Sequence, residues 1–221
     1  MSKLKVLAVL IAWAMTAWPL LHAGDLSRYR EFELDSNLLE VAKQVDAKVE
    51  DAKIIHERPA LIQELSWRAG SDDAVKQIQF RFYRGDLFRM VVHYNRYNTQ
   101  GLTAQDLIDA TSAIYGEALR PTAEIAVNTI YGSNEAAEVI ARWEDADWSY
   151  NLVRLKFEPS FTLAVFSKRL DSLARAAIDE AIELDMQEAP QREIAEKRRE
   201  EMSKTAELEK ARQANKPRFR P

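Results

Sequence analysis

The sequence predicts an α+β fold in which two tandem repeats, each a helix followed by three strands, form antiparallel sheet, with a long helix after them. The first observation is a hairpin pattern from Ile78 to Tyr94, where apolar and polar residues alternate around a turn at Arg84-Gly85-Asp86. The second is a similar alternation from Val153 to Val165, about 75 positions later. The third is the helical spacing of apolar residues from Lys168 onward.

Residues 1–23 have the pattern of a secretory signal peptide. Lys3 and Lys5 precede an apolar run from Val6 to Leu21, and His22-Ala23-Gly24 supplies small residues for cleavage after Ala23. We therefore expect a periplasmic or secreted protein. The alternative is an uncleaved N-terminal membrane anchor, because the run is close to the minimum length that spans a bilayer.

Composition and charge narrow the possible functions. The chain has 221 residues, 47% of them hydrophobic, and no cysteine, which excludes disulfides, thiolate metal sites and a lipidated cysteine. Residues 188–221 carry ten Lys or Arg against seven Asp or Glu; removing this +3 and the +2 of residues 1–23 from the total of −4 leaves −9 for residues 24–187. An acidic body argues against nucleic-acid binding, which requires a basic surface.

The first repeat is expected over residues 24–100. Residues 29–34 alternate as a short strand, and a helix capped by Asp35 or Ser36 follows them. Residues 48–55 are interpreted as a second short helix, and Pro59 breaks the pattern before a strand that contains Leu65 and Trp67. The hairpin strands then place on their core face Ile78, Phe80, Phe82, Phe88, Met90, Val92 and Tyr94.

The second repeat is expected over residues 101–187. Thr103 caps a helix that Gly116 ends, and Trp143 lies in a strand 76 positions after Trp67, which favours a duplication. No element is assigned between residues 117 and 135. The second hairpin turns at residues 158–160, and its expected core face contains Val153, Leu155, Phe157, Phe161, Leu163 and Val165.

The C-terminal part is predicted to be helical, in two sections separated by Pro190. The first section has an apolar stripe that docks on the sheet: Leu170, Leu173, Ala177, Ile178 and Ala181. Residues 188–221 form a charged tail, either a solvated helix or a disordered segment, because their apolar residues are too few to form a core. The tail's positive charge suits weak contact with an anionic surface; the alternative is an inert solubilising extension.

The helix of the second repeat carries a resemblance to a known family. Gly101-Leu102-Thr103, then Leu107 and Tyr115-Gly116, is similar to the opening motif of the outer-membrane-assembly lipoproteins of the BamE type. A tandem arrangement of such units over residues 29–170 resembles the secreted β-lactamase inhibitor protein family. The resemblance implies a binding scaffold with a concave sheet that holds a partner protein. Membrane anchoring is not implied, because the lipidated cysteine is missing.

The candidate partner-binding surface is the second face of the sheet, opposite the core face. It combines apolar residues with Tyr and Arg, a composition typical of protein interfaces, unless the C-terminal helix covers it. The residues assigned to this surface are Arg81, Tyr83, Arg89, Val91, His93, Arg142, Arg154 and Phe166.

No catalytic, metal or cofactor site is predicted. His56 and His93 lack the spacing of metal ligands, and the acidic residues lie in predicted loops. We therefore expect a non-enzymatic protein-binding or envelope-assembly module with a protein or peptide partner in the cell envelope. The alternative is a hydrolase or small-ligand-binding enzyme that uses loop carboxylates, which requires the loops of Asp72 and Asp145 to converge.

Overall fold

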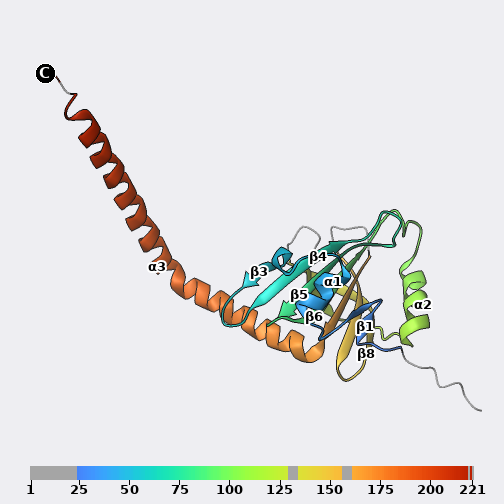
Figure 1. Ribbon diagram of the computed structural model, residues 1–221. Helices are drawn as coiled ribbons and strands as arrows, with labels where there is room; N and C mark the ends of the chain where they lie inside the picture. The colour runs from blue at the N-terminus through green and yellow to red at the C-terminus, as the bar shows by residue number, and fades with distance from the viewer. Residues whose placement is uncertain (1–23, 129–133, 156–160, 219, 221) are drawn as a thin grey trace, which may run out of the picture.

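One sheet of eight antiparallel strands organises the protein in the computed structural model, which describes residues 24–128, 134–155, 161–218 and 220 (Figure 1). The strand order is β3-β4-β5-β6-β10-β9-β8-β7. The strands are β3 (Lys53–His56), β4 (Ile62–Arg68), β5 (Val75–Tyr83), β6 (Asp86–Tyr94), β7 (Glu124–Asn128), β8 (Asn134–Glu144), β9 (Trp148–Arg154) and β10 (Phe161–Ser167). The expected signal peptide and the turn at 158–160 lie outside the described residues.

The helices confirm the α+β class and the long C-terminal helix. They are α1 (Leu38–Gln44), the 3-10 helix η1 (Val49–Asp51), α2 (Ala104–Tyr115) and α3 (Lys168–Asn215). The predicted cap Thr103 accepts a hydrogen bond from the Asp106 backbone N–H, and Gly116 ends α2 with a φ of 90°. In α1 the cap is Asn37, one residue beyond the predicted positions. None of the helices described is both long and apolar enough to cross a membrane.

Each of α1 and α2 is followed by four strands, where the sequence predicted three. The short helix expected over residues 48–55 is only η1, and β3 follows it and pairs with β4. The unassigned segment contains β7, which pairs with β8. The strand expected over 29–34 is instead a small hairpin of β1 (Arg28–Tyr29) and β2 (Phe32–Glu33). These short edge and hairpin strands carry too few alternating residues to be recognised from periodicity.

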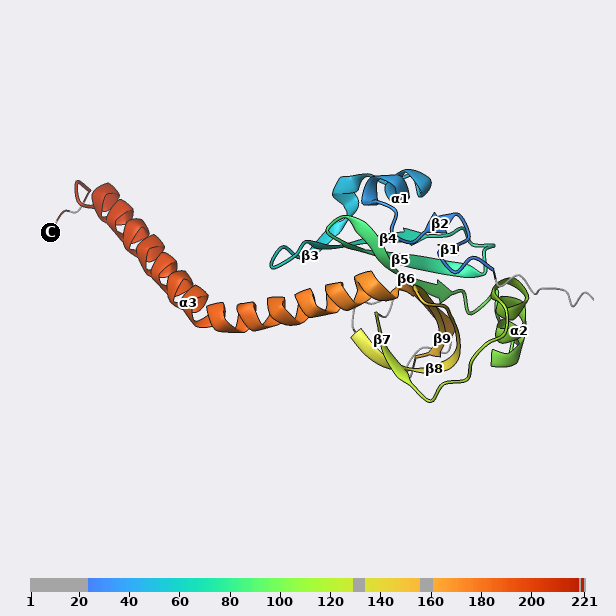
Figure 2. The same ribbon diagram turned by 90° about the horizontal axis from the view of Figure 1, so that it is seen from below.

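Pro190 was predicted to interrupt the C-terminal helix, but it lies inside α3. The helix changes direction partway along its length, and its last part projects away from the body (Figures 1 and 2). A proline lacks the N–H that would bond to the carbonyl four residues earlier, and its ring crowds that carbonyl, which bends a helix. Arg192 donates a hydrogen bond to the nearby Asp185 carbonyl at 3.2 Å.

The two faces of the sheet are covered by different elements (Figure 2). The first face holds the main hydrophobic core and is covered by α1, the β1–β2 hairpin and α2; its largest buried side chains include Phe32, Phe80, Phe82, Trp143 and Tyr150. The second face is covered by the start of α3, where Leu170 and Ala174 pack against Ile62 and Phe88. The half of the sheet that ends in β7 curves round beneath α3.

Two irregularities in strand pairing change which residues face the main core. In the β5–β6 pair the register shifts beyond Arg81, so that Leu87 joins the main core and Phe88 lies on the second face. In the β8–β9 pair an extra residue on β8, between Val139 and Ala141, places Val139 on the second face. Strand β9 itself alternates regularly, with Leu152 in the main core, whereas the predicted core residues Val153 and Leu155 lie in a separate cluster on the second face.

The last part of α3 makes no buried contact, because residues 189–215 are all exposed. We expect truncation after Gln187 to leave the free energy of unfolding nearly unchanged. The truncation mainly removes the exposed Arg58–Glu188 ion pair, and solvent screens such exposed pairs strongly. Urea unfolding of the two chains tests this. A larger loss of stability would mean that this part of the helix belongs to the cooperative fold.

Candidate functional site

Seven of the eight predicted partner-binding residues lie on the second face of the sheet, and Arg154 does not. Arg154 pairs with Phe161, whose side chain belongs to the main core, so both side chains lie on the first face. Strand β9 alternates regularly but in the phase opposite to the predicted one, so that Leu152 and not Val153 faces the main core.

Three of the predicted residues are enclosed and cannot line an outer surface. Arg89, Val91 and His93 are 6%, 0% and 1% exposed. The strands curve and α3 covers the middle of the second face. The sequence analysis had left open whether the C-terminal helix covers this face. The other four, Arg81, Tyr83, Arg142 and Phe166, are half-buried.

Arg89 connects three elements beneath α3. Its guanidinium donates to the Asp171 carboxylate on α3 at 2.7 Å and to the Ala126 carbonyl on β7 at 2.8 Å, and it lies 5.0 Å from the centre of the Phe166 ring. Burial lowers the pKa of Arg89 from its ordinary value, and the Asp171 charge opposes that change. Because Ala126 belongs to the edge strand, this contact also protects part of an otherwise open sheet edge.

The remaining polar side chains of the second face bind one another. His93 lies between Gln79, 3.5 Å from its Nε2, and Thr162, 3.3 Å from its Nδ1. Arg142 donates to Asn151 at 2.7 Å, and Asn151 itself is fully buried. Arg81 is ion-paired with Glu64 on the neighbouring strand. Such an enclosed, mutually bonded set of groups stabilises one arrangement of the sheet and leaves little polar capacity for a partner.

The loop carboxylates do not converge on one site. Val75, directly after the Asp72 loop, pairs with Tyr94, whereas Trp148, directly after the Asp145 loop, pairs with Ser167. The β6–β10 register places these two pairs at opposite ends of the strands. The arrangement required by the enzyme hypothesis is therefore absent for Asp72 and Asp145.

The carboxylates in these loops also have local structural partners. Arg30 binds Asp73 with two hydrogen bonds of 2.8 Å and lowers the pKa of that carboxyl to about 2. Asp145 accepts hydrogen bonds from the backbone N–H groups of Asp147 and Trp148. Both side chains hold loops in place.

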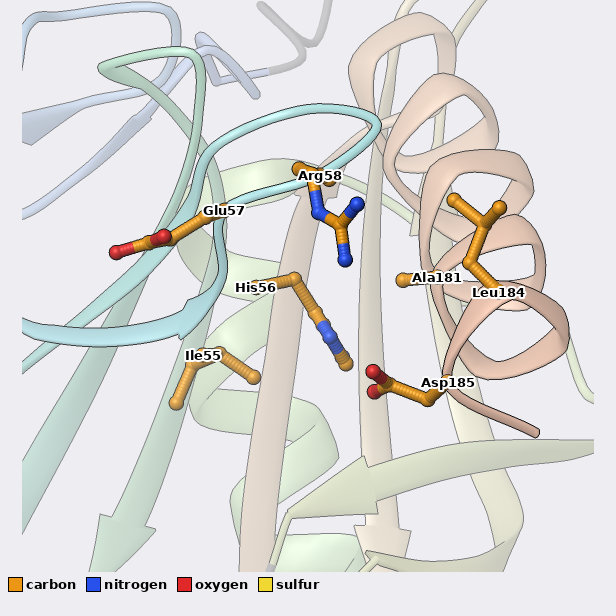
Figure 3. A pocket seen from close by; sticks show the side chains of 7 residues that line it. All are labelled: Ile55, His56, Glu57, Arg58, Ala181, Leu184 and Asp185. Carbon is orange, nitrogen blue, oxygen red and sulfur yellow. The ribbon is translucent and has the colours of Figure 1, made fainter. Parts of the chain in front are cut away.

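A cavity of about 200 Å³ between the end of β3 and α3 contains the other histidine of the body (Figure 3). The His56 ring is directed toward Asp185, while Glu57 points away from α3. Arg58, on the same segment, forms hydrogen bonds of 3.1 and 2.9 Å with Glu188. The Arg58–Glu188 ion pair thus attaches α3 to the loop after β3. Within the described residues no three His, Asp or Glu are placed to hold a metal ion.

An open groove lies at the end of the first face, beyond the part that α2 covers. It consists of two cavities of about 420 and 670 Å³ on either side of Arg154 and Phe161, whose side chains are in contact. We call it the end groove. Its lining residues are Arg96, Tyr97, Thr99, Gln100, Gly101, Leu102 and Phe161 on one side, and Pro121, Thr122, Ala123, Glu124, Glu138, Arg154 and Leu155 on the other.

The floor of the end groove is a row of side chains that crosses four neighbouring strands. Phe161 pairs with Arg154, Arg154 with Glu138, and Glu138 with Glu124. The guanidinium of Arg154 lies 5.3 Å from the centre of the Phe161 ring. The two glutamates lie directly opposite each other, an arrangement that is unfavourable by itself and is relieved by a nearby cation.

The loop before α2 forms one wall and is held firmly. The side chain of Asn98 donates to the carbonyls of Ser71 and Asp73 at 2.8 and 2.7 Å, and Thr99 donates twice to the Asn95 carbonyl. On this wall Tyr97 is 74% exposed and Leu102 is 48% exposed.

The opposite wall is the link between α2 and β7. Leu119 exchanges two backbone hydrogen bonds with Arg142, and Arg120 donates to Gln105 on α2 at 2.8 Å. Both walls are therefore fixed before any partner binds, which lowers the entropic cost of binding.

Of the residues predicted to bind a partner, only Arg154 belongs to the end groove. The sequence signal that could have pointed to the other residues of the end groove was the pair Tyr97 and Leu102. These are large apolar residues in a segment with no strand or helix periodicity. The sequence could not show that Glu124 and Glu138 lie opposite each other, because Glu124 belongs to a strand that was not predicted.

The chain was compared with protein-family models, with curated proteins and with solved structures, and none of them matches it. The resemblance to the BamE-type lipoproteins and to the β-lactamase inhibitor protein therefore has no support beyond the residues that suggested it. Function is accordingly inferred from the end groove and from the surfaces of this chain.

Proposed function

We propose that this protein is a non-catalytic binding module of the periplasm or the extracellular space, and that a protein or peptide partner of the cell envelope binds in its end groove. The observation that carries the proposal is the exposure of Tyr97 and Leu102 on a fixed wall beside two open cavities. Exposed aromatic and arginine side chains at a preformed depression are the usual anchors of protein interfaces.

The charges along the end groove indicate the chemistry of the partner segment. Arg96 lies over the Tyr97 ring at one end, and Glu124 and Glu138 lie at the other. A segment that fits both ends places an apolar side chain against Tyr97 and Leu102, an acidic group near Arg96, and a Lys or Arg beside the two glutamates. That basic group would relieve the repulsion between the glutamates.

We further propose that the two halves of the sheet arose by duplication, as the sequence spacing indicates. The order β3-β4-β5-β6 is mirrored by β10-β9-β8-β7, and the halves meet where β6 pairs with β10. Trp67 on β4 and Trp143 on β8 occupy corresponding strands. In this view the floor of the end groove belongs to the second half, where the curvature of β7 to β9 has no equivalent in the first half (Figure 2).

The test of the binding function is affinity capture from the native cell envelope with the Tyr97→Ala/Arg154→Glu variant beside the wild type. We expect the variant to lose its specific partner, since each anchor residue contributes about 2 kcal/mol or more to a tight interface. Quantitative mass spectrometry of the captured proteins measures the loss.

The matched control for this capture is Leu39→Ala/Arg169→Glu, which changes an exposed leucine and an exposed arginine away from the end groove. It should capture the partner as the wild type does. If the groove variant and the control retain every captured protein equally, the end groove is not the binding site.

A further inference from the structure

The last part of α3 is a helix with no partner within the described chain. Residues 189–215 are all exposed, and their large apolar residues Ile194, Met202 and Leu208 are 46%, 72% and 72% exposed. At a rise of 1.5 Å per residue this segment is about 40 Å long. We call residues 189–215 the distal helix. A helix that is isolated in water gains little from its own hydrogen bonds, so its side-chain pattern is informative.

Four of the six glutamates of the distal helix lie along one side of it. Glu193, Glu196, Glu200 and Glu207 recur at spacings of three, four and seven and thus lie along one line of the helix. The opposite line passes through residues 194, 198, 202, 205, 209, 212 and 216. These residues are Ile194, Arg198, Met202, Thr205, Glu209, Arg212 and Lys216.

The second line is basic and partly apolar. Its single acidic residue, Glu209, is bound by Arg212 at 3.1 Å. On the acidic side Lys197 is paired with Glu193 at 2.7 Å. Arg198, Arg212 and Lys216 therefore share one side of the helix with the exposed apolar residues Ile194 and Met202, a combination that suits contact with an anionic membrane surface.

The position of the distal helix keeps this face away from the acidic body. Residues 24–187 carry a net charge of −9, which by itself would be repelled by an anionic surface. The helix bends and then projects outward from the body (Figures 1 and 2). Its length of about 40 Å is several times the screening length of about 8 Å in physiological salt. The body's negative charge therefore does not cancel the attraction at the far end.

We infer that the distal helix, together with its C-cap residue Lys216, binds the surface of an anionic phospholipid bilayer through the side that carries Arg198, Met202 and Arg212. The basic residues contact the headgroup phosphates, Met202 enters the interface, and the line of glutamates faces water. This inference is independent of the proposed partner in the end groove.

The test uses a local reporter, because the chain contains no cysteine. Full-length Thr205→Cys carries an environment-sensitive dye on the basic face, and Ala211→Cys carries it on the line of glutamates. With vesicles of phosphatidylglycerol and phosphatidylcholine at low salt, we expect a blue shift from Thr205→Cys and little change from Ala211→Cys. The shift should vanish with pure phosphatidylcholine and at about 1 M salt, where the screening length is about 3 Å. The dye reports only its own surroundings, so contacts elsewhere in the chain do not contribute.

The matched pair of variants removes two positive charges from either side of the distal helix. In the Thr205→Cys background, Arg198→Gln/Arg212→Gln should raise the vesicle concentration for a half-maximal shift by about tenfold or more. Lys197→Gln/Lys204→Gln should stay within about twofold, although it has the same net charge. Each variant also loses one ion pair within the helix, so circular dichroism should give equal helicity.

Three results would overturn the inference. The first is the absence of any shift with anionic vesicles. The second is an equal effect of the two double variants, which would mean that only net charge matters. The third is a concentration-dependent shift without vesicles, which would place a second copy of the chain on this face.

Discussion

Replacing Asp171 by alanine is expected to lower the free energy of unfolding by about 3 to 5 kcal/mol, the usual cost of removing one partner from a buried ion pair. Asp171 is 4% exposed and binds Arg89, which is 6% exposed. The variant leaves that guanidinium largely buried and without its carboxylate, while its contacts with the Ala126 carbonyl and the Phe166 ring remain. Urea unfolding of both chains measures the difference.

The matched control for Asp171 is Asp179→Ala, two turns further along α3, where the side chain is exposed. This change should alter stability by no more than about 0.5 kcal/mol. The double variant Arg89→Met/Asp171→Leu should recover most of the loss, because a buried ion pair can often be replaced by apolar side chains at little cost. If Asp171→Ala unfolds like the wild type, Arg89 is hydrated and α3 is not closed over the second face.

Arg89→Met alone should cost less than Asp171→Ala. Asp171 also accepts a hydrogen bond from Arg175 at 2.7 Å, so it keeps one cationic partner when Arg89 is absent. Arg89, in contrast, depends on Asp171 for the carboxylate that balances its charge beneath α3. Comparing the loss in the free energy of unfolding of the two single variants therefore tests which of the two buried charges is more destabilising when its partner is removed.

Local signals in the sequence were sufficient for the second helix, because its ends are encoded in a few adjacent residues. Thr103 and Asp106 form a capping box, and Gly116 supplies the positive φ at the end. The hairpin β5–β6 could likewise be predicted, from the alternation of apolar and polar residues and from the turn at Arg84-Gly85, where both φ angles are positive.

The face assignments failed where they depended on a partner strand. Phe88 continues the apolar alternation of β6, yet the register shift opposite Arg81 moves it to the second face. A similar shift between Val139 and Ala141 placed Val139 on the second face. In β9 the adjacent apolar residues Leu152 and Val153 allow either phase, and Leu152 is the one that faces the main core. A bulge is decided by how two distant segments pair, and one-dimensional periodicity carries no information about that pairing.

The candidate site was only partly predictable for the same reason. The sequence identified an amphipathic second face with unusual Arg and Tyr content, but coverage by α3 depends on where a distant helix docks. That docking uses small side chains, Ala174, Ala177 and Ala181, together with the buried Asp171. Alanine side chains are small and only weakly hydrophobic, so this stripe gives a weak amphipathic signal. The sequence therefore did not decide whether α3 covers the second face of the sheet.

Trp143→Ala is expected to lower the free energy of unfolding by about 3 to 5 kcal/mol, and Trp67→Ala by clearly less. The two residues occupy corresponding strands, but Trp143 is 1% exposed and Trp67 is half-buried. The Trp143 indole also donates to the Gly116 carbonyl at 3.0 Å and to Ser112 Oγ at 3.2 Å, which attaches the end of α2 to β8.

Trp143→Phe separates these two contributions, because it keeps much of the ring volume and removes the hydrogen bonds. We expect a decrease in stability of about 1 to 2 kcal/mol, since the Gly116 carbonyl loses its indole donor beside the core. Hydrogen exchange at the amides of α2 should then increase more than exchange at those of α1, which packs on the other half of the sheet. If Trp143→Ala and Trp67→Ala cost the same, or if α1 and α2 respond equally, Trp143 does not hold α2 in place, and the wall of the end groove beyond Gly116 must be fixed by other contacts.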